Sequence, residues 1–271
     1  MNIRLHLFEL EDQSWFPHVI RQGMLDFLRF MISRLSAYEP ALPLLEDLLR
    51  RSGQPHITDL CSGAGGGIAG IREALSQRMG QPVHVTLSDL YPNVPSYEYL
   101  QAQSNGLIDF IPEPVDATAV PATVQGVRTI FSSFHHFRPR QAVAILQDAA
   151  DKGAIIGIFE GSGKTWLELL VFLLTFPILI LLVTPFIRPL KLSRLFFTYI
   201  LPLIPLGILW DGAVSLFRIY NPRMLQQLVA QVQAPGYTWR TGKVGSDLGK
   251  QVIYLIGYPE GEGQNNSTMK L

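Results

Sequence analysis

Apolar and polar residues follow two different periods along the chain. Residues 15–36 carry apolar side chains at helical spacing, and a second short helix is predicted over residues 40–52. Short apolar runs then alternate with helical stretches. Predicted strands cover 56–60, 83–87, 107–112, 128–133 and 154–159, and predicted helices cover 68–79, 94–105 and 139–151. This alternation predicts a doubly wound α/β domain with a parallel sheet.

Two long apolar runs interrupt this alternation. Residues 169–187 include 19 positions without a charge and residues 195–210 another 16, with Arg188, Lys191 and Arg194 between the runs. The earlier pattern then resumes, with a helix predicted near 222–233 and strands near 236–241 and 250–258. The predicted organisation is an N-terminal helical lid over 1–54, an α/β domain over 55–165 and 211–258, an apolar helical hairpin over 166–210, and a flexible tail over 259–271.

Composition narrows the class of protein. Lys and Arg number 22, as do Asp and Glu, so the net charge is zero and a nucleic-acid partner is not expected. Apolar residues make up 48% of the chain, which argues against disorder. The single cysteine, Cys61, excludes a disulfide framework and fits a small apolar filler. The acidic N-terminal stretch around Glu9 lacks the apolar core of a secretory signal, so we expect the α/β domain on the cytoplasmic side.

A glycine-rich segment between the first predicted strand and the next helix has two interpretations. Gly65 to Gly70 satisfies G-x-G-x-x-G, with Asp89 nineteen residues beyond, which is the spacing of a dinucleotide-binding site. Alternatively, Asp59 precedes Gly63 and Gly65 in the order D-x-x-x-G-x-G. Either way, the turn lets a ligand approach the backbone closely at a helix N-terminus.

The second interpretation resembles the class I S-adenosylmethionine (SAM)-dependent methyltransferases, because further motifs follow in the order of that family. The resemblance implies a Rossmann-like seven-stranded sheet with an antiparallel last strand. It implies that Asp89 holds the ribose, that Asp116 lies beside the adenine, and that the segment 130–137 ends at the transferring methyl group. The cofactor-binding residues implied by the resemblance are Asp59, Leu60, Ser62, Gly63, Gly65, Asp89, Leu90, Asp116, Ala117, Ser132 and Ser133.

A third apparent motif fails on spacing. Gly161-Ser-Gly-Lys164-Thr165 looks like the end of a P-loop, but the glycine required at position 158 is Ile158. Binding of a nucleoside triphosphate is therefore not expected.

Candidate catalytic residues follow the predicted fourth strand. Methyl transfer is an in-line displacement, so positioning supplies much of the rate, and an oxygen acceptor also has to lose a proton. His135 and His136 are candidates for that base or for orienting the acceptor; alternatively, one caps the next helix and the other packs in the pocket wall. No Asp/Glu cluster lies near this strand in the sequence, so metal-dependent chemistry is disfavoured and no metal is predicted.

Candidate substrate residues lie on either side of the α/β domain. Asp211, Ser215 and Arg218 share one helical face directly after the hairpin and could face the substrate, or form a helix cap and an ion pair. Trp15 could belong to a lid over the pocket, together with Glu9, Glu11, Asp12 and Arg21, or pack in the core.

The apolar hairpin predicts attachment to a membrane surface. Prolines interrupt both runs, and two full spans would carry three cations across the bilayer, so a monotopic arrangement with the cations among head groups is favoured. A dimer interface or a roof over the pocket is the soluble alternative. The sequence thus favours a methyltransferase that acts on an apolar small molecule or lipid at a membrane. The alternatives are an NAD(P)-linked oxidoreductase and a non-catalytic SAM-binding scaffold.

Overall fold

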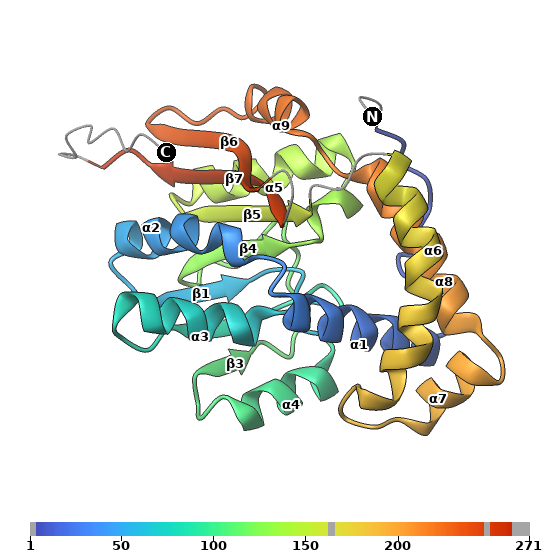
Figure 1. Ribbon diagram of the computed structural model, residues 1–271. Helices are drawn as coiled ribbons and strands as arrows, with labels where there is room; N and C mark the ends of the chain where they lie inside the picture. Colours follow the sequence, from blue (N-terminus) through green and yellow to red (C-terminus); the bar gives the residue numbers. More distant parts are fainter. Residues whose placement is uncertain (1–3, 162–165, 247–249, 262–271) are drawn as a thin grey trace.

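The fold is built on one seven-stranded sheet (Figure 1). The computed structural model describes residues 4–161, 166–246 and 250–261. The strands are β1 (His56–Asp59), β2 (His84–Leu87), β3 (Ile108–Phe110), β4 (Val127–Phe131), β5 (Ile156–Gly161), β6 (Tyr237–Gly245) and β7 (Gln251–Pro259). Their order is β3-β2-β1-β4-β5-β7-β6, with β1 to β5 parallel and β7 antiparallel to both of its neighbours. The predicted α/β class and antiparallel last strand are confirmed.

Helices cover both faces of the sheet. One apolar core packs α2 (Leu42–Ser52), α3 (Ile68–Met79) and α4 (Val94–Gln103) against one face. A second core packs α5 (Pro139–Asp151) and α9 (Pro222–Val229) against the other. The strands between them carry apolar side chains on both sides, as buried parallel strands do; all five residues of β4 are buried.

The apolar insertion forms three helices at the end of the molecule toward which the arrows of β1 and β5 point (Figure 1). They are α6 (Trp166–Val183), α7 (Leu192–Tyr199) and α8 (Leu203–Arg218). Pro177 was expected to interrupt the first run, but it lies inside α6, which continues through it. The predicted boundary after residue 210 falls within α8, so one helix joins the insertion to the rest of the chain.

Helix α1 (His18–Leu35) connects the insertion to the sheet. Its first half packs with α6 and α8 in a third apolar core that includes Met24, Phe27, Ile180 and Ile208. Its last turns approach the glycine loop, where a side chain on Gly67 would lie 2.6 Å from Ile32 Cγ2. The predicted N-terminal helix is thus confirmed, and it spans the distance between the insertion and the loop.

A buried ion pair ties the insertion to α1. Arg194 and Asp26 are each 1% exposed, and Nη1 of Arg194 lies 2.6 Å from Oδ2 of Asp26. Lys191 Nζ lies 2.9 Å from the same oxygen. The expectation that all three cations of the hairpin lie among head groups is therefore wrong for Arg194, which is buried against a carboxylate on α1.

Two segments singled out in the sequence lie mostly outside the described residues. Most of the rejected P-loop-like segment, at residues 162–165, and most of the tail, at 262–271, fall there.

Candidate functional site

The glycine loop between β1 and α3 is a run of backbone turns with left-handed conformations. Cys61, Gly63, Gly65 and Gly67 have φ values of 56°, 54°, 74° and 80°. A side chain on Gly65 would lie 2.3 Å from Leu100 Cδ1, so both conformation and space require glycine there. The loop is therefore built from residues that let the chain fold tightly at the carboxyl end of β1.

Asp59 supports the loop from inside. Its Oδ1 accepts a hydrogen bond from Thr129 Oγ1 on β4 at 2.8 Å, and its carbonyl oxygen accepts one from Ser62 Oγ at 2.8 Å. Burial raises the pKa of Asp59 to about 7. Asp59 and Ser62 thus lie together as the motif predicts, and they hold the loop by contacts within the protein.

Asp89, at the end of β2, is also bound to the loop. Its Oδ2 accepts a hydrogen bond from the Gly63 amide at 2.9 Å, and its Oδ1 accepts one from the Tyr91 amide at 2.8 Å. Burial raises its pKa, against the opposing effect of those amides and of the charge on His136. The side chain is partly exposed, and each oxygen keeps a second lone pair for a ligand hydroxyl.

The remaining residues that are predicted to bind the methyl donor differ in exposure. Asp116 is exposed and accepts hydrogen bonds from the amide and hydroxyl of Thr118 at 2.8 and 2.7 Å. Leu60 and Ala117 are buried in the core, whereas Leu90 is 43% exposed. Asp116 and Leu90 are therefore accessible to a ligand, while Leu60 and Ala117 belong to the apolar core that packs α5 and α9.

Two polar side chains that sequence reasoning missed lie beside Asp89. Both polar atoms of the Asn93 side chain and Oη of Tyr97 are buried, without a hydrogen-bond partner among the described residues. Burial raises the pKa of Tyr97, and the charges of Asp89 and Asp59 add to that shift. Asn93 stands four residues after Asp89, so a search for polar residues just beyond the second strand would have found it.

The end of β4 contacts both the glycine loop and the segment before α2. Ser133 Oγ donates a hydrogen bond to the Cys61 carbonyl at 3.1 Å. Ser132, with a φ of 48°, shares a hydrogen bond with the hydroxyl of Tyr38, which is buried against Phe131. The two predicted serines therefore lie at the junction of β1 and β4.

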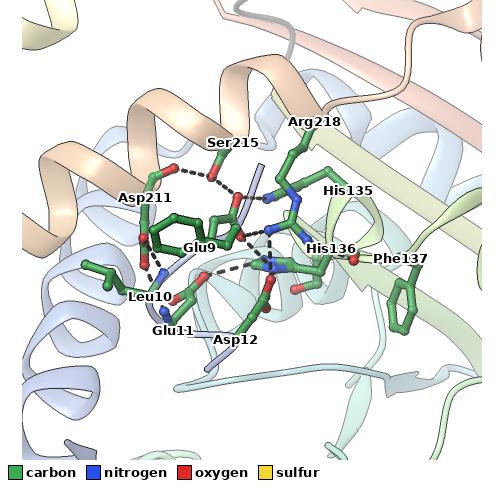
Figure 2. A network of polar contacts seen from close by, with 12 residues as sticks. Glu9, Leu10, Glu11, Asp12, His135, His136, Phe137, Asp211, Ser215 and Arg218 are labelled. Atoms are coloured by element: carbon green, nitrogen blue, oxygen red, sulfur yellow. Dashed lines mark hydrogen bonds and ion pairs between the residues drawn. The ribbon is translucent and has the colours of Figure 1, made fainter. Parts of the chain in front are cut away.

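Glu9 meets the histidine pair at the carboxyl end of β4 (Figure 2). Glu9 is fully buried, and its Oε2 lies 2.8 Å from Nδ1 of His136. Nε2 of His135 faces Oε1 of Glu9 at 3.8 Å, while its Nδ1 lies 2.8 Å from Oε2 of Glu160 on β5. Asp12 Oδ1 is 2.9 Å from Nδ1 of His136. We call Glu9, His135 and His136 the histidine–glutamate cluster.

The expectation that no acidic cluster lies near the fourth strand is wrong, because acidic side chains that are distant in the sequence gather there in the folded structure. The N-terminal segment, which we call the strap (residues 4–13), crosses the carboxyl end of β4 and brings its acids there. Arg4 fixes the strap by donating hydrogen bonds to the carbonyl oxygens of His135 and Phe137, at 3.0 and 2.9 Å. These contacts join residues more than 120 positions apart, so no local sequence pattern indicates them.

Burial and close charges displace several pKa values in this region. Burial opposes the charged form of His136, but hydrogen bonds to Asp12 and Glu9 outweigh it and raise the pKa of His136 well above its ordinary value. Burial alone would raise the pKa values of Glu9 and Asp12, yet hydrogen bonding with His136 lowers both. Burial raises the pKa of Glu11 to about 7. His136 is consequently held as a cation among carboxylates.

Helix α8 presents its three predicted polar residues to the strap. Asp211 accepts hydrogen bonds from the amides of Leu10 and Glu11 at 2.6 and 3.0 Å. Ser215 Oγ lies 2.8 Å from Oε1 of Glu9. Arg218 Nη1 lies 2.8 Å from Glu9 Oε2. The helical face is confirmed, and its side chains bind the strap.

Trp15, the last of the predicted substrate residues, makes an aromatic contact at the surface. It is 67% exposed, and its ring meets Phe16 edge-on with centroids 6.0 Å apart. Its predicted role toward substrate has no contact in the structure that tests it.

Comparison with known proteins bears on the fold. No protein-family model matches the chain, and no curated protein matches it. Among solved structures, the methyltransferase domain of bacterial CtHen1-CN is 10% identical, with a TM-score of 0.48 over 82% of this chain and 99% of that one. An O-methyltransferase family protein from Burkholderia thailandensis is 15% identical, with a TM-score of 0.47 over 88% of this chain and 60% of its own length.

A third solved structure is magnesium protoporphyrin IX methyltransferase from Synechocystis with bound SAH. It is 12% identical, with a TM-score of 0.39 over 83% of this chain and 84% of that one. The strand order, with β7 antiparallel between β5 and β6, decides the architecture. The fold is the Rossmann-like seven-stranded sheet with an antiparallel last strand that the sequence resemblance implied. The insertion α6–α8 and the strap are the features of this chain whose contacts have to be interpreted from its own residues.

Proposed function

We propose that the protein transfers a methyl group from SAM to a lipophilic small-molecule acceptor at the cytoplasmic surface of a membrane. The observation that carries the proposal is the double role of α8. Its outer residues Leu206 and Trp210 are 59% and 43% exposed, and its inner face binds the strap next to the histidines. One helix therefore joins an exposed apolar surface to the polar site at the end of the sheet.

The residues around the glycine loop suit the donor. The left-handed glycines turn the chain tightly at the carboxyl end of β1, where this fold class binds its ligands, and Asp89 retains lone pairs for ribose hydroxyls. Asn93 and Tyr97 contribute buried polar atoms without partners, and a bound polar ligand would satisfy them. A neighbouring fold contains SAH, which supports the same class of ligand here.

The donor, when bound, supplies a methyl group on a positively charged sulfur. The chain positions the acceptor against it, because in-line displacement depends mostly on alignment. The predicted roles of His135 and His136 toward the acceptor place its hydroxyl at the end of β4. Since Glu9 and Asp12 raise the pKa of His136 well above its ordinary value, His136 does not take the acceptor's proton at neutral pH. His135 or a neighbouring carboxylate is left for that proton.

The insertion supplies the surface for the membrane. Leu170, Leu174, Ile178 and Leu182 repeat every four residues on α6 and are 53% to 64% exposed. The window Leu169–Phe186 is long and apolar enough to cross a bilayer, whereas α7 and α8 form a pair bent by 77°. A bent, partly packed insertion with a broad outward apolar surface favours a monotopic attachment in one leaflet. A second copy of the chain on this surface is the alternative.

An NAD(P)-linked oxidoreductase is less well supported. The doubly wound dinucleotide-binding sheet has six strands in the order 3-2-1-4-5-6, whereas here an antiparallel strand separates β5 from β6. The G-x-G-x-x-G spacing of Gly65, Gly67 and Gly70 therefore occurs in a different sheet.

The identity of the methyl donor is tested by calorimetric titration of the detergent-purified protein with SAH and, in parallel, with NADH. We expect SAH to bind, and we expect Asp89→Ala to weaken it at least tenfold. Asp109→Ala, at an exposed carboxylate on β3, is the matched control and should bind SAH as the wild type does. Binding of NADH in place of SAH would overturn the proposal. Binding of SAH without methyl transfer to any acceptor tested would favour the scaffold function.

The acceptor and the membrane are tested with vesicles of mixed phosphatidylcholine and phosphatidylglycerol. Replacing Leu174, Ile178 and Leu182 by Asn should lower vesicle binding about 100-fold, taking roughly 1 kcal/mol for each partly inserted side chain. Leu35→Asn, at an exposed leucine outside the insertion, is the control and should bind like the wild type. A panel of apolar phenols and polar catechols then tests the acceptor, and methylation of polar members alone would contradict a lipophilic substrate.

A further inference from the structure

The histidine–glutamate cluster has the composition and spacing of a metal site. One ligand atom from each of Glu9, His135 and His136 can be chosen so that all three lie within 4.8 Å of one another. Glu9 is fully buried and His135 is 6% exposed, so the three groups meet inside the protein. Imidazole nitrogens and carboxylate oxygens are ligands of Zn²⁺ and of its first-row neighbours.

One gap in the cluster is too wide for a hydrogen bond and suits a bridging ion. Nε2 of His135 faces Oε1 of Glu9 across 3.8 Å. Bonds of about 2.0–2.2 Å from one Zn²⁺ to each atom span that distance at an open angle. Nδ1 of His136 lies 2.8 Å from the other Glu9 oxygen, so a small rotation of either side chain brings it to the same ion.

The ring orientation of His135 is already fixed in the way that metal sites require. Its Nδ1 lies 2.8 Å from Oε2 of Glu160, and its backbone amide donates to Oε1 of the same residue at 3.1 Å. With Nδ1–H bound by a carboxylate, Nε2 carries the free lone pair and points toward Glu9. Metal-ligating histidines almost always bind a carboxylate or carbonyl in this manner.

The surrounding charges leave room for a further cation. Five carboxyl groups gather here, while Arg4 and Arg218 bring two guanidinium groups. The carboxyl groups are those of Glu9, Glu11, Asp12, Glu160 and Asp211. Arg218 Nη1 contacts Glu9 and Asp12 at 2.8 and 2.7 Å (Figure 2).

We propose that Glu9, His135 and His136 bind one divalent transition-metal ion, with Zn²⁺ preferred to Mn²⁺ and both preferred to Mg²⁺. Two imidazoles in the ligand set favour the later metals of the first row over Mg²⁺. Asp12, whose side chain is 34% exposed, marks the open side on which a further ligand can enter. If the proposed methyl transfer holds, that further ligand is the acceptor oxygen; this last point alone rests on the proposed function.

The test uses the full-length, untagged protein after treatment with a chelator. Equilibrium dialysis against Zn²⁺, Mn²⁺ or Mg²⁺, with bound metal measured by mass spectrometry, should give one Zn²⁺ per chain. Co²⁺ should develop visible d–d absorption bands from nitrogen ligation. His135→Gln should abolish binding, and Glu160→Gln, which keeps all three ligands, should weaken it 10- to 100-fold. His84→Gln, at an exposed histidine on β2, is the matched control.

Each result decides the proposal. Equal Zn²⁺ binding by wild type and His135→Gln, or no Zn²⁺ in the wild type, would overturn it and leave the cluster as a set of ion pairs that fixes the strap. Circular dichroism and SAH titration on the same samples separate this outcome from misfolding and from failure of the proposed function. A protein that binds SAH but no metal contradicts only the metal site.

Discussion

Removing Asp26 should destabilise the protein strongly, because it leaves a buried guanidinium without its carboxylate. Arg194 and Asp26 are each 1% exposed and lie 2.6 Å apart. Loss of one partner of a buried ion pair costs about 3–5 kcal/mol, more than the gain from the pair itself. We therefore expect Asp26→Leu to lower the free energy of unfolding by about 3–5 kcal/mol.

The double variant Asp26→Leu/Arg194→Met should recover about 1–3 kcal/mol of that loss. It removes both charges, and its remaining cost comes from the carbonyl oxygens of Ile187 and Pro189, which Arg194 now binds at 2.7 and 2.8 Å. At about 1 kcal/mol for each hydrogen bond, the double variant should be about 2 kcal/mol less stable than the wild type.

Urea unfolding of the detergent-solubilised variants, followed by circular dichroism, measures these differences. Lys191→Met is the control, because Lys191 binds the same carboxylate but is 25% exposed and should cost at most about 1 kcal/mol. A double variant as unstable as Asp26→Leu would refute the reasoning. So would an Asp26→Leu protein within about 1 kcal/mol of the wild type.

Three further predictions concern the site and its surface. Glu11→Gln should gain stability over the wild type by up to about 3 kcal/mol between pH 5 and 8, measured by urea unfolding with chelator. Burial raises the Glu11 pKa from 4.5 to about 7, so the wild type loses stability as pH rises through that window; a constant difference would contradict this. Gly65→Ala should cost about 1–3 kcal/mol in thermal unfolding, whereas Gly70→Ala, where a side chain meets open space, should not. Phe186→Asn, at a 68% exposed residue, should reduce vesicle binding and leave unfolding unchanged.

The fold could be predicted because its evidence is local. Apolar periods placed α3 and α5 at their observed bounds, and the parallel strands followed from short apolar runs. The helix at α9 is shorter than predicted: it ends at Val229 although an apolar pattern continues, because the chain turns there toward β6. Where tertiary packing sets the end of a helix, hydrophobic periodicity does not predict that end.

The cluster could be predicted only in part. The two histidines were found from their place after β4, and the acids near Glu9 were noted only as a possible lid. The acids reach the histidines because the strap contacts α8, about 200 residues away along the chain, as in the contact of Ser215 with Glu9. Similarly, Asp89 was expected to face a ligand, and its two hydrogen bonds to backbone amides follow from the turn of the glycine loop, which sequence spacing does not describe.

The strap is synthesised long before α8, so the contact between them forms only late in translation. At about 5–20 residues per second, roughly 10–40 s separate the appearance of Glu9 from that of Arg218. Through that interval the acids of the strap remain in water, unpaired with α8. The strand β7, which lies between β5 and β6, is made later still, so α6 and α7 leave the ribosome before the sheet can close. The apolar helices therefore have to find their surroundings before the sheet is complete.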